Sequence, residues 1–497
     1  MISDSPGTTV EEGRKQSGIS LPLLVGLAIF FFIVASPENH LFLDPDTYLH
    51  LASGNWILDH YTVPQVDIFS FNTLGQTWVD HEWLSQIVLA LAYRLNGFAG
   101  VQILVGGVVA ITFGYQLRFL LHRVPPMYAL LFCALSFVSV MGHLIARPHI
   151  FSWPILVFWF ASLFKAVEKQ ELPTYKLTLV MVLWANLHGS FVLGLACLPI
   201  FVLEALLQSH PDSRRSVLKH WVLFSALSLL CSVLTPYTWR GLLFAPALMS
   251  SEYLNKILEW MPPTGNDLIP IAFWGLLILG MACFGFLRLT IARFILLTGI
   301  FYESLMHVRY GSILGLITPL IIALPFGLAY TKRFQSRVKS QKLDGVLERI
   351  STPSTHKSFI TITAIAFALA VWVLSMHASA PLLSITPKEA VNAAIELPIK
   401  GRVLNFYNFG GYLIYRNIPV FIDGRADLYG DQYMGRYFEI TQAESFEKLE
   451  SLLNQSEITW TIFPPNEPIV KVLDQSRLWR RSYADDNAVI HTKVVSN

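Results

Sequence analysis

Charged residues are scarce in this sequence of 497 residues. Asp, Glu, Lys and Arg make up 14% of the chain, against about 25% in a typical soluble domain. Hydrophobic residues make up 53%, and the mean hydropathy is +0.49. This composition excludes a soluble cytosolic enzyme and a disordered chain.

The sequence also lacks a strong excess of charge of one sign and a cysteine framework. The formal net charge is +2, so we expect no nucleic-acid partner. The four cysteines all fall inside apolar runs, at Cys133, Cys197, Cys231 and Cys283. Their placement excludes a disulfide-rich secreted scaffold and a structural zinc site. The composition therefore predicts a polytopic α-helical membrane protein.

Long apolar runs are abundant. A bilayer core of about 30 Å requires roughly 20 apolar residues per helix. Runs near that length lie at about 19–36, 98–121, 127–145, 150–167, 219–235, 268–287, 290–306, 311–330 and 358–377. One further run, 177–208, would measure about 48 Å as a single helix, which is too long for one span. Because Asn186-Leu187-His188-Gly189-Ser190 interrupts it, we predict two shorter helices meeting at the outer face. The total is then about 11 transmembrane helices.

The distribution of Lys and Arg predicts the orientation. Segment 331–357 holds seven basic residues and two acids, and further basic residues follow the second, fourth, sixth and eighth spans. All of them lie on one side only if 177–208 is split. We therefore predict a multi-pass protein of the inner (plasma) membrane. Its parts are a cytoplasmic N-terminal tail (1–18), a transmembrane domain (19–377) and an external C-terminal domain (378–497). A signal peptide cleaved near Ala35-Ser36 is the alternative for the first run.

The first external loop, 37–97, is acidic. It contains seven acids and a single basic residue, Arg94. Asp44 and Asp46 follow the first span directly. Apolar residues over 48–58 then recur at helical spacing and predict an amphipathic helix along the membrane interface. A second helix is predicted over 81–95, with Asp80 as its N-cap.

Five candidate bases or ligands lie in this loop, at Asp44, Asp46, His50, His81 and Glu82. Groups of this kind abstract protons and bind divalent ions. Simpler explanations stay open for several of them. Asp46 is also suited to cap the interfacial helix, and Asp44 could be solvated at the end of a span. His81 and Glu82 could be ordinary residues of a first helical turn, where an acid complements the helix dipole.

The pattern Asp44-Pro45-Asp46, followed by a long loop with an interfacial helix, resembles the GT-C class of membrane glycosyltransferases. That class includes protein O-mannosyltransferases, aminoarabinose transferases and oligosaccharyltransferases. A closer resemblance is to a group of bacterial GT-C-like membrane proteins without an assigned substrate. The shared stretches are DPDTYLHLASGNWIL, WVDHEWLSQ, ARPHIFSW, WANLHGSFVLG, GGYLIYR and FIDGRADLYG, and the resemblance covers nearly the whole chain.

This resemblance implies a GT-C-like fold, a polyprenyl-phosphate sugar as donor, and a catalytic carboxylate in the first external loop. We expect Asp44 to be the general base, with Asp46 as the second candidate. The phosphate leaving group requires cations or a metal ion. A divalent metal ion bound by Asp46 and Glu82 is therefore a candidate cofactor, and His81 and Glu82 are candidate substrate contacts.

Two arginines at predicted external span ends are candidate phosphate ligands, because a guanidinium binds phosphate bidentately. They are Arg147, in Ala146-Arg147-Pro148-His149, and Arg309, between the ninth and tenth spans. Snorkelling or pairing with an acid is the simpler explanation for both. His188 lies at the break in 177–208, where non-helical backbone at membrane depth has to line protein or a cavity. It is a further candidate for the site, with a helix-break hydrogen bond as the alternative. Glu259 is a candidate substrate contact or an interfacial anchor.

The C-terminal region has a soluble pattern, and we predict a small external α/β domain of about 110 residues. Strands are predicted at 403–407, 419–422, 459–463 and 488–492, a turn at Gly410-Gly411 and a helix over 443–454. Polar residues at a strand end are candidates for binding the acceptor or for a structural salt-bridged turn. They are Asp423, Arg425 and Asp427.

The sequence thus predicts a GT-C-like glycosyltransferase of the cell envelope, with membrane lipids, a polyprenyl-phosphate donor and an extracytoplasmic glycan, lipid or protein acceptor as partners. A non-catalytic lipid-glycan flippase or glycan assembly scaffold with the same fold is the alternative. A ligase that transfers a whole glycan is a third hypothesis. A transporter should carry polar residues inside several spans, whereas apart from Asn186, His188 and Glu204 the predicted spans are largely apolar.

Overall fold

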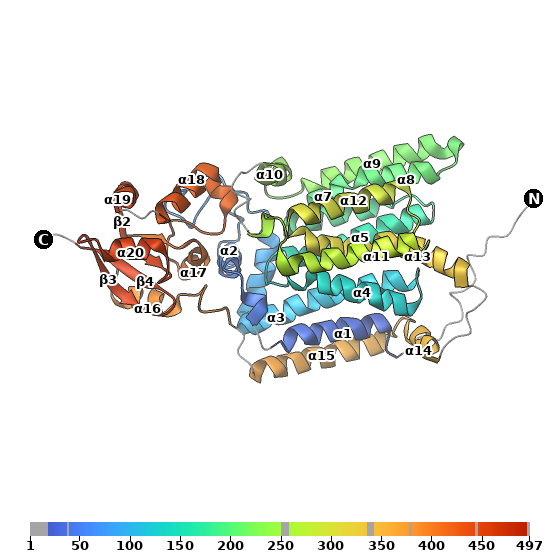
Figure 1. Cartoon of the computed structure of the whole chain (residues 1–497), viewed down its shortest axis with the longest axis horizontal. Helices are drawn as coiled ribbons and strands as arrows, with labels where there is room; N and C mark the ends of the chain where they lie inside the picture. Colours follow the sequence, from blue (N-terminus) through green and yellow to red (C-terminus); the bar gives the residue numbers. More distant parts are fainter. Residues whose placement is uncertain are drawn as a thin grey trace, which may run out of the picture.

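The computed structural model describes residues 18–36, 39–249, 258–334, 342–376, 380–442 and 446–494. The predicted N-terminal tail, 1–18, lies outside this part of the chain except for its last residue. Figure 1 shows a bundle of helices whose axes are roughly aligned, with a smaller α/β domain at one end. The fold is therefore a helical bundle, as the apolar runs predicted, with a smaller C-terminal domain, as the soluble pattern of that region predicted.

Helices occupy every apolar run identified in the sequence. They are α1 (Leu21–Val34), α3 (Trp83–Leu121), α4 (Pro126–Met141), α5 (His149–Glu168), α6 (Leu179–Leu187), α7 (Phe191–Ala196), α8 (Leu198–Gln208), α9 (Arg214–Ser232), α11 (Leu268–Cys283), α12 (Ile291–Met306), α13 (Tyr310–Phe334) and α15 (His356–Met376). In the described part of the chain, six stretches are long and apolar enough to cross a membrane. The count of eleven spans is therefore not confirmed and stays a prediction.

The predicted break in 177–208 is present. Helix α6 ends at Leu187, His188 has an extended backbone, and α7 begins at Phe191. The break lies against the start of α3, where the Ser85 hydroxyl donates to the Leu187 carbonyl oxygen at 2.7 Å and the Trp83 indole N–H donates to Asn186 at 2.9 Å. The non-helical backbone is thus paired with protein groups, as its depth in an apolar bundle requires.

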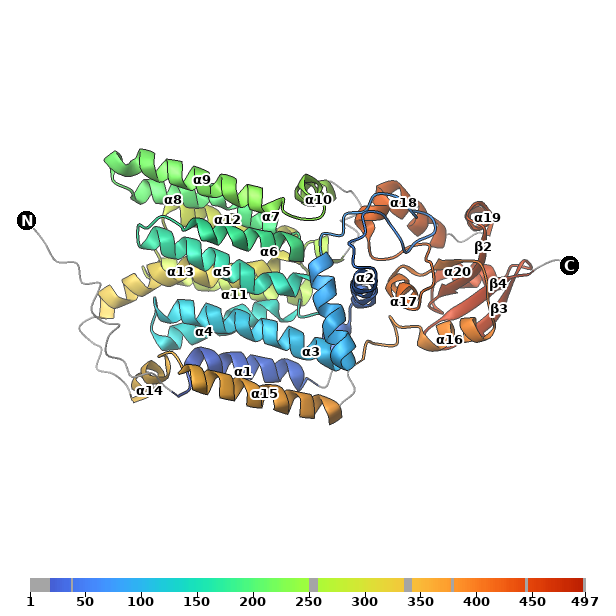
Figure 2. The same ribbon diagram turned by 180° about the vertical axis from the view of Figure 1, so that it is seen from behind.

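Basic residues gather at the end of the bundle opposite the C-terminal domain. Arg123 pairs with Glu168 at 2.6 Å, and Arg293 pairs with Glu168 at 2.9 Å and Glu204 at 3.0 Å. These contacts join the connection after α3 to α5, α8 and α12 at this end. Figure 2 shows α14 (Lys342–Ile350), from the basic segment, at the same end. This arrangement matches the one-sided distribution predicted from the loops.

The first loop lies between the bundle and the C-terminal domain. It contains a short 3₁₀ turn, η1 (Asn39–Phe42), and α2 (Asp46–His60), which is seen end-on in Figure 1 and so crosses the bundle direction. The second predicted helix begins at Trp83 and continues into the next span through a kink at Asn96 and Gly97. The prediction of Asp80 as N-cap is wrong: its buried carboxylate instead accepts hydrogen bonds from Ser53 and Gln86.

Helix α2 is covered by protein on two sides, by the C-terminal domain and by the bundle. Tyr48 and Leu49 pack with Tyr412 and Leu413 of α17 (Gly410–Tyr415), while Leu51 joins the core of the bundle. The predicted turn at Gly410-Gly411 is therefore wrong, because these two residues begin a helix that packs on α2.

The C-terminal domain contains a four-stranded mixed sheet of strand order β1-β2-β4-β3. Its strands are β1 (Arg402–Asn405), β2 (Ile458–Phe463), β3 (Trp479–Ala484) and β4 (Val489–Lys493), with helices α16 (Lys388–Glu396), α18 (Ala426–Thr441), α19 (Phe446–Gln455) and α20 (Pro468–Asp474) around it. Strand β1 is parallel to β2, and the other pairs are antiparallel. The strand predicted over 419–422 is wrong as a member of this sheet, because Val420 bridges to Ser70 of the first loop instead.

Candidate functional site

Two carboxylates mark the start of α2. Asp44 and Asp46 flank Pro45, and a carboxylate oxygen of Asp44 accepts a hydrogen bond from the Asp46 backbone N–H at 2.7 Å. Negative charge at this position is favourable because the unpaired N–H groups of a helix start carry partial positive charge. The two side chains are 11% and 17% exposed, so both lie in a largely covered site.

One arginine links these carboxylates with a third. Arg147, in the connection between α4 and α5, lies 3.2 Å from Asp44 and 2.9 Å from Asp46. It also pairs with Glu259. The predicted alternative of pairing with an acid is therefore what the structure contains. Sequence reasoning did not connect Glu259 with this cluster, because it lies 112 residues away from Arg147 along the chain.

The pKa values of the three acids are shifted in different directions. Burial raises the pKa of Asp44, and it raises the pKa of Asp46 to about 7, with the Asp44 charge as the second cause. The pKa of Glu259 is instead lowered to about 2, mainly by Arg147. A carboxylate with a pKa near neutral exchanges protons most effectively at neutral pH. The cluster therefore combines one acid whose pKa is lowered with two acids whose pKa is raised.

Glu82 is the centre of a second cluster. The Nε2 atoms of His188, His81 and His50 lie 3.4, 3.6 and 3.9 Å from its carboxylate oxygens. Burial raises the pKa of Glu82 to about 7 and lowers the pKa of His81 to about 4. His50 is buried, and neither of its ring nitrogens has a hydrogen-bond partner. The predicted site residues His81, Glu82 and His188 are thus brought together, with His50 beside them.

The segment around Glu259 is held against the connection between α12 and α13. The backbone N–H groups of Val308 and Arg309 donate to the Met261 and Glu259 carbonyl oxygens at 2.9 and 3.1 Å. The Arg309 guanidinium carbon lies 4.3 Å from the centre of the Trp260 ring. A cation over an aromatic face is held in place while its N–H groups keep their donor capacity. Arg309 therefore lies next to Glu259, which belongs to the Arg147 cluster.

An apolar groove of about 860 Å³ opens beside the Glu82 cluster. Trp83, which follows Glu82, and Asn186, which lies two residues before His188, both line it. The rest of its lining is mainly aliphatic and includes Leu84, Leu179, Val182, Leu183 and Leu234. The groove therefore offers an apolar surface along these helices, and Trp83 places one part of it next to Glu82 in the chain.

The residues predicted to hold a metal ion do not form a ligand set. Across the described ranges, no group of three or more His, Cys, Asp or Glu side chains is arranged to hold one. Asp46 pairs with Arg147, and Glu82 is surrounded by imidazoles. The two predicted ligands thus belong to separate clusters.

The predicted acceptor residues of the C-terminal domain have different environments. Asp423 and Arg425 are buried and pair with each other at 2.7 Å, so the predicted alternative of a structural salt bridge describes them. Asp427 is exposed and stays a candidate for contact with an acceptor.

Similar folds occur among solved structures. No family model and no curated protein matches this chain. The oligosaccharyltransferase of Archaeoglobus fulgidus in its apo form matches over 89% of this chain and 69% of its own chain, at a TM-score of 0.54 and 11% identity. A structure of AglB from the same organism, with an inhibitory peptide and a dolichol-phosphate, matches over 89% of this chain and 68% of its own chain, at a TM-score of 0.51 and 10% identity. ArnT from Cupriavidus metallidurans, bound to undecaprenyl phosphate, matches 96% of this chain and 98% of its own at 0.54 and 12%.

These similarities define the class of fold. The chain has the GT-C-like fold of membrane glycosyltransferases, as the resemblance of its motifs predicted. It is similar over nearly its full length to ArnT and over most of its length to an oligosaccharyltransferase. At identities of 10–12% the likeness describes the fold alone.

Proposed function

We propose that this protein is a membrane glycosyltransferase that moves a sugar from a polyprenyl-phosphate donor to an extracytoplasmic acceptor. The observation that carries the proposal is the Asp44–Asp46–Arg147–Glu259 cluster, in which one arginine gathers three carboxylates at the end of a GT-C-like bundle. An apolar groove that begins at Trp83, the residue after Glu82, supports it. Two of the matched structures, of AglB and ArnT, hold dolichol-phosphate and undecaprenyl phosphate. These lipids are the class of donor carrier that such a groove suits.

Asp44 is the proposed general base, and Asp46 is the second candidate. Transfer requires the acceptor hydroxyl to lose a proton as it attacks the anomeric carbon, while the bond from that carbon to the phosphate oxygen breaks. Burial favours this chemistry, because it raises the pKa of both acids toward the working pH. Arg147 orients the two carboxylates through its ion pairs.

The leaving phosphate requires a cation, and Arg309 is the proposed ligand. Its guanidinium is oriented by Trp260, whereas Arg147 already pairs with three carboxylates. His81, His188 and Glu82 are the proposed polar contacts between the headgroup and the acceptor. The polyprenyl chain would lie in the groove next to Trp83, since its lining is mainly apolar and burial of apolar surface is favourable.

The proposed location is the inner membrane, with the C-terminal domain outside the cytoplasm. The basic segments gather at the opposite end of the bundle, which under the positive-inside rule would be the cytoplasmic end. A divalent metal ion stays a prediction, and no step here depends on it. Incubation of the purified protein with EDTA tests it: loss of transfer that Mg²⁺ or Mn²⁺ restores would support a metal requirement, and unchanged transfer would contradict it.

Substitution of Asp44 tests the function. Asp44→Asn removes the proton acceptor with little change in shape, and we expect transfer to fall about 10²-fold or more, since a positioned base contributes about that much. Mass spectrometry of glycolipids and glycoproteins from a deletion strain identifies the product, and complementation with each variant measures transfer. Asp59→Asn is the matched control, because Asp59 lies in the same loop and pairs with Arg94 at the surface. Full transfer by Asp44→Asn at normal membrane levels would remove Asp44 from the base role.

A further inference from the structure

A loop of the C-terminal domain covers the acidic cluster of the first loop. The loop is Asp423-Gly424-Arg425, and it lies directly over Asp46. A Cβ atom added at Gly424 would come within 1.9 Å of one carboxylate oxygen of Asp46 and within 2.8 Å of the other. The backbone at Gly424 has no left-handed φ angle, so it is the close approach to Asp46, and not backbone conformation, that requires glycine here.

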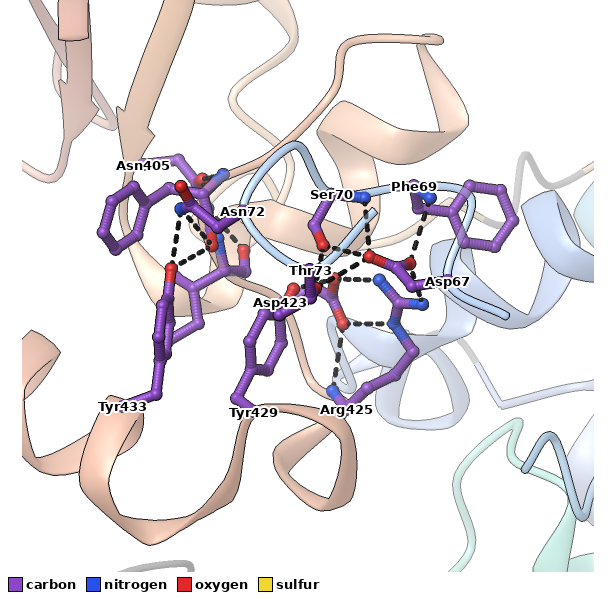
Figure 3. Close-up of polar contacts among 12 residues, drawn as sticks. Asp67, Phe69, Ser70, Asn72, Thr73, Asn405, Asp423, Arg425, Tyr429 and Tyr433 are labelled. Carbon is purple, nitrogen blue, oxygen red and sulfur yellow. Dashed lines mark hydrogen bonds and ion pairs between the residues drawn. The ribbon is translucent and has the colours of Figure 1, made fainter. Parts of the chain in front are cut away.

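An ion-pair clamp fixes this loop to the first loop. Figure 3 shows Arg425 between Asp423 and Asp67. Its guanidinium donates to Asp423 through Nε at 2.8 Å and Nη2 at 2.7 Å, and to Asp67 through Nη1 at 2.7 Å. All three side chains are at least 95% buried. The fork geometry of arginine can satisfy both acids at once, so the loop has a defined position relative to the first loop.

Further hydrogen bonds join the first loop to the C-terminal domain near these ion pairs. The Phe71 N–H donates to the Val420 carbonyl oxygen, and the Val420 N–H donates to that of Phe69, each at 3.2 Å. The Asn72 side chain donates to the Tyr433 hydroxyl at 2.7 Å (Figure 3). These bonds join residues more than 340 positions apart in the sequence. The C-terminal domain is thus docked on the first loop through backbone and side-chain contacts.

A second group of the C-terminal domain lies near enough to Asp46 to be affected by its charge. Tyr407, in a 3₁₀ turn before α17, has its pKa raised by burial and by the negative charges of Asp46 and Asp423. Gly411 of α17 lies against the start of α2, where an added Cβ would come within 2.6 Å of the Pro45 carbonyl oxygen. Three separate parts of the domain, around 407, 411 and 424, therefore surround the Asp44-Pro45-Asp46 segment.

We propose that the C-terminal domain contributes to the site. Gly424 is a positioning residue that keeps the Asp46 carboxylate in contact with Arg147. The ion pairs of Arg425 with Asp423 and Asp67 keep Gly424 in place. This inference rests on the proposed function only for its effect on transfer. With one carboxylate oxygen under Gly424 and the other 2.9 Å from Arg147, Asp46 has a single orientation. Removal of the cover would admit water and free the carboxylate from that orientation.

The first experiment measures docking without any assay of activity. Gly424→Ala places a methyl group against Asp46, so we expect it to lower the thermal midpoint of the purified full-length protein. In an Asp46→Ala background the obstacle is gone, and the same substitution should have little effect. Equal lowering in both backgrounds would overturn the proposed contact. Gly142→Ala is the control, because an added Cβ there meets nothing within 4 Å.

The second experiment measures the effect on transfer. We expect Gly424→Ala to reduce the rate of transfer at saturating donor by at least about tenfold, which corresponds to about 1.4 kcal/mol of lost transition-state stabilisation. Binding of undecaprenyl phosphate, measured by native mass spectrometry, should change less than twofold, because the groove residues are untouched. A variant that keeps full transfer would overturn the positioning role.

The clamp gives a third readout. Arg425→Lys keeps the charge without the fork, and Arg425→Gln removes both. If the clamp positions Gly424, the transfer rate per folded protein should fall in the order wild type, Arg425→Lys, Arg425→Gln, while undecaprenyl phosphate binding by the folded fraction persists. Equal transfer by Arg425→Gln and wild type would contradict the clamp. If no glycan product is found for the wild type, the proposed transferase function fails. The thermal comparison still tests the contact between Gly424 and Asp46, so the two proposals are tested separately.

Discussion

At the scale of single residues, burial gives three neighbouring acids the same unusual property. It raises the pKa of Asp46, Asp80 and Glu82 to about 7 in each case. In the unfolded chain these groups titrate near pH 4. Between about pH 4 and 7 the folded protein therefore keeps protons that the unfolded chain has lost, and the free energy of unfolding falls as the pH rises through this window.

Asp80 provides a test of this pH dependence away from the proposed chemistry. Its carboxylate is 2% exposed and accepts hydrogen bonds from Ser53 and Gln86. Asp80→Asn removes the titration, so we expect the variant to lose less thermal stability than wild type when the pH is raised from 5 to 8. Thermal unfolding in detergent at both values measures this. Asp59→Asn, at a side chain that is 60% exposed, is the control. A parallel loss in wild type and Asp80→Asn would contradict the assignment.

At the scale of elements, small residues allow α17 and α2 to approach closely. Gly410 lies against the backbone of Ile422 and Asp423, and Gly411 lies against the Pro45 carbonyl oxygen. The pair looked like a turn in the sequence because glycine is common in turns. The actual reason for glycine is helix packing, which periodicity along one segment does not reveal.

Gly411→Ala tests this packing. In a helix, alanine is normally more stable than glycine by about 1 kcal/mol, but here the new Cβ would lie 2.6 Å from a backbone oxygen. We expect a net loss of about 1–3 kcal/mol, the usual cost of overpacking, measured by chemical or thermal unfolding. Gly280→Ala in α11 is the matched control, because nothing lies within 4 Å of its added Cβ. Stabilisation by both substitutions would show that the contact is loose.

At the scale of the whole molecule, polar groups join parts that are distant in the sequence. At one end, the Arg425 clamp docks the C-terminal domain on the first loop. At the other end, Arg293 is 3% exposed, joins Glu168 to Glu204, and donates to the Ile321 carbonyl oxygen at 2.7 Å. Buried charges of this kind are tolerated because each has partners of opposite charge.

Substitution of Arg293 should therefore be costly. Arg293→Met leaves Glu204 buried without its cation, and we expect a loss of about 3–5 kcal/mol in the free energy of unfolding. The double variant Arg293→Met, Glu204→Leu removes the uncompensated charge and should recover a large part of that loss. Thermal unfolding of both variants in the same detergent measures the difference. A double variant that is less stable than the single one would contradict this explanation.

The sequence by itself determined the membrane class, the positions of the helices, the break at 186–190, and the acidic motif at Asp44 and Asp46. These features are local, since hydrophobic runs and helix interruptions are encoded within one stretch of chain. The same holds for β1, β2 and β4, whose short apolar runs were identified, whereas α18 was missed because its sequence has only a weak pattern of apolar residues.

The tertiary structure alone decided how the site is assembled. Arg147 meets Asp46 across 101 residues, and Arg425 meets Asp67 across 358. No periodicity relates such positions, because their partners are selected by the packing of whole helices and domains. The raised pKa of Asp46 has the same origin: it depends on the removal of water by surrounding segments, which exist around it only after the chain has folded.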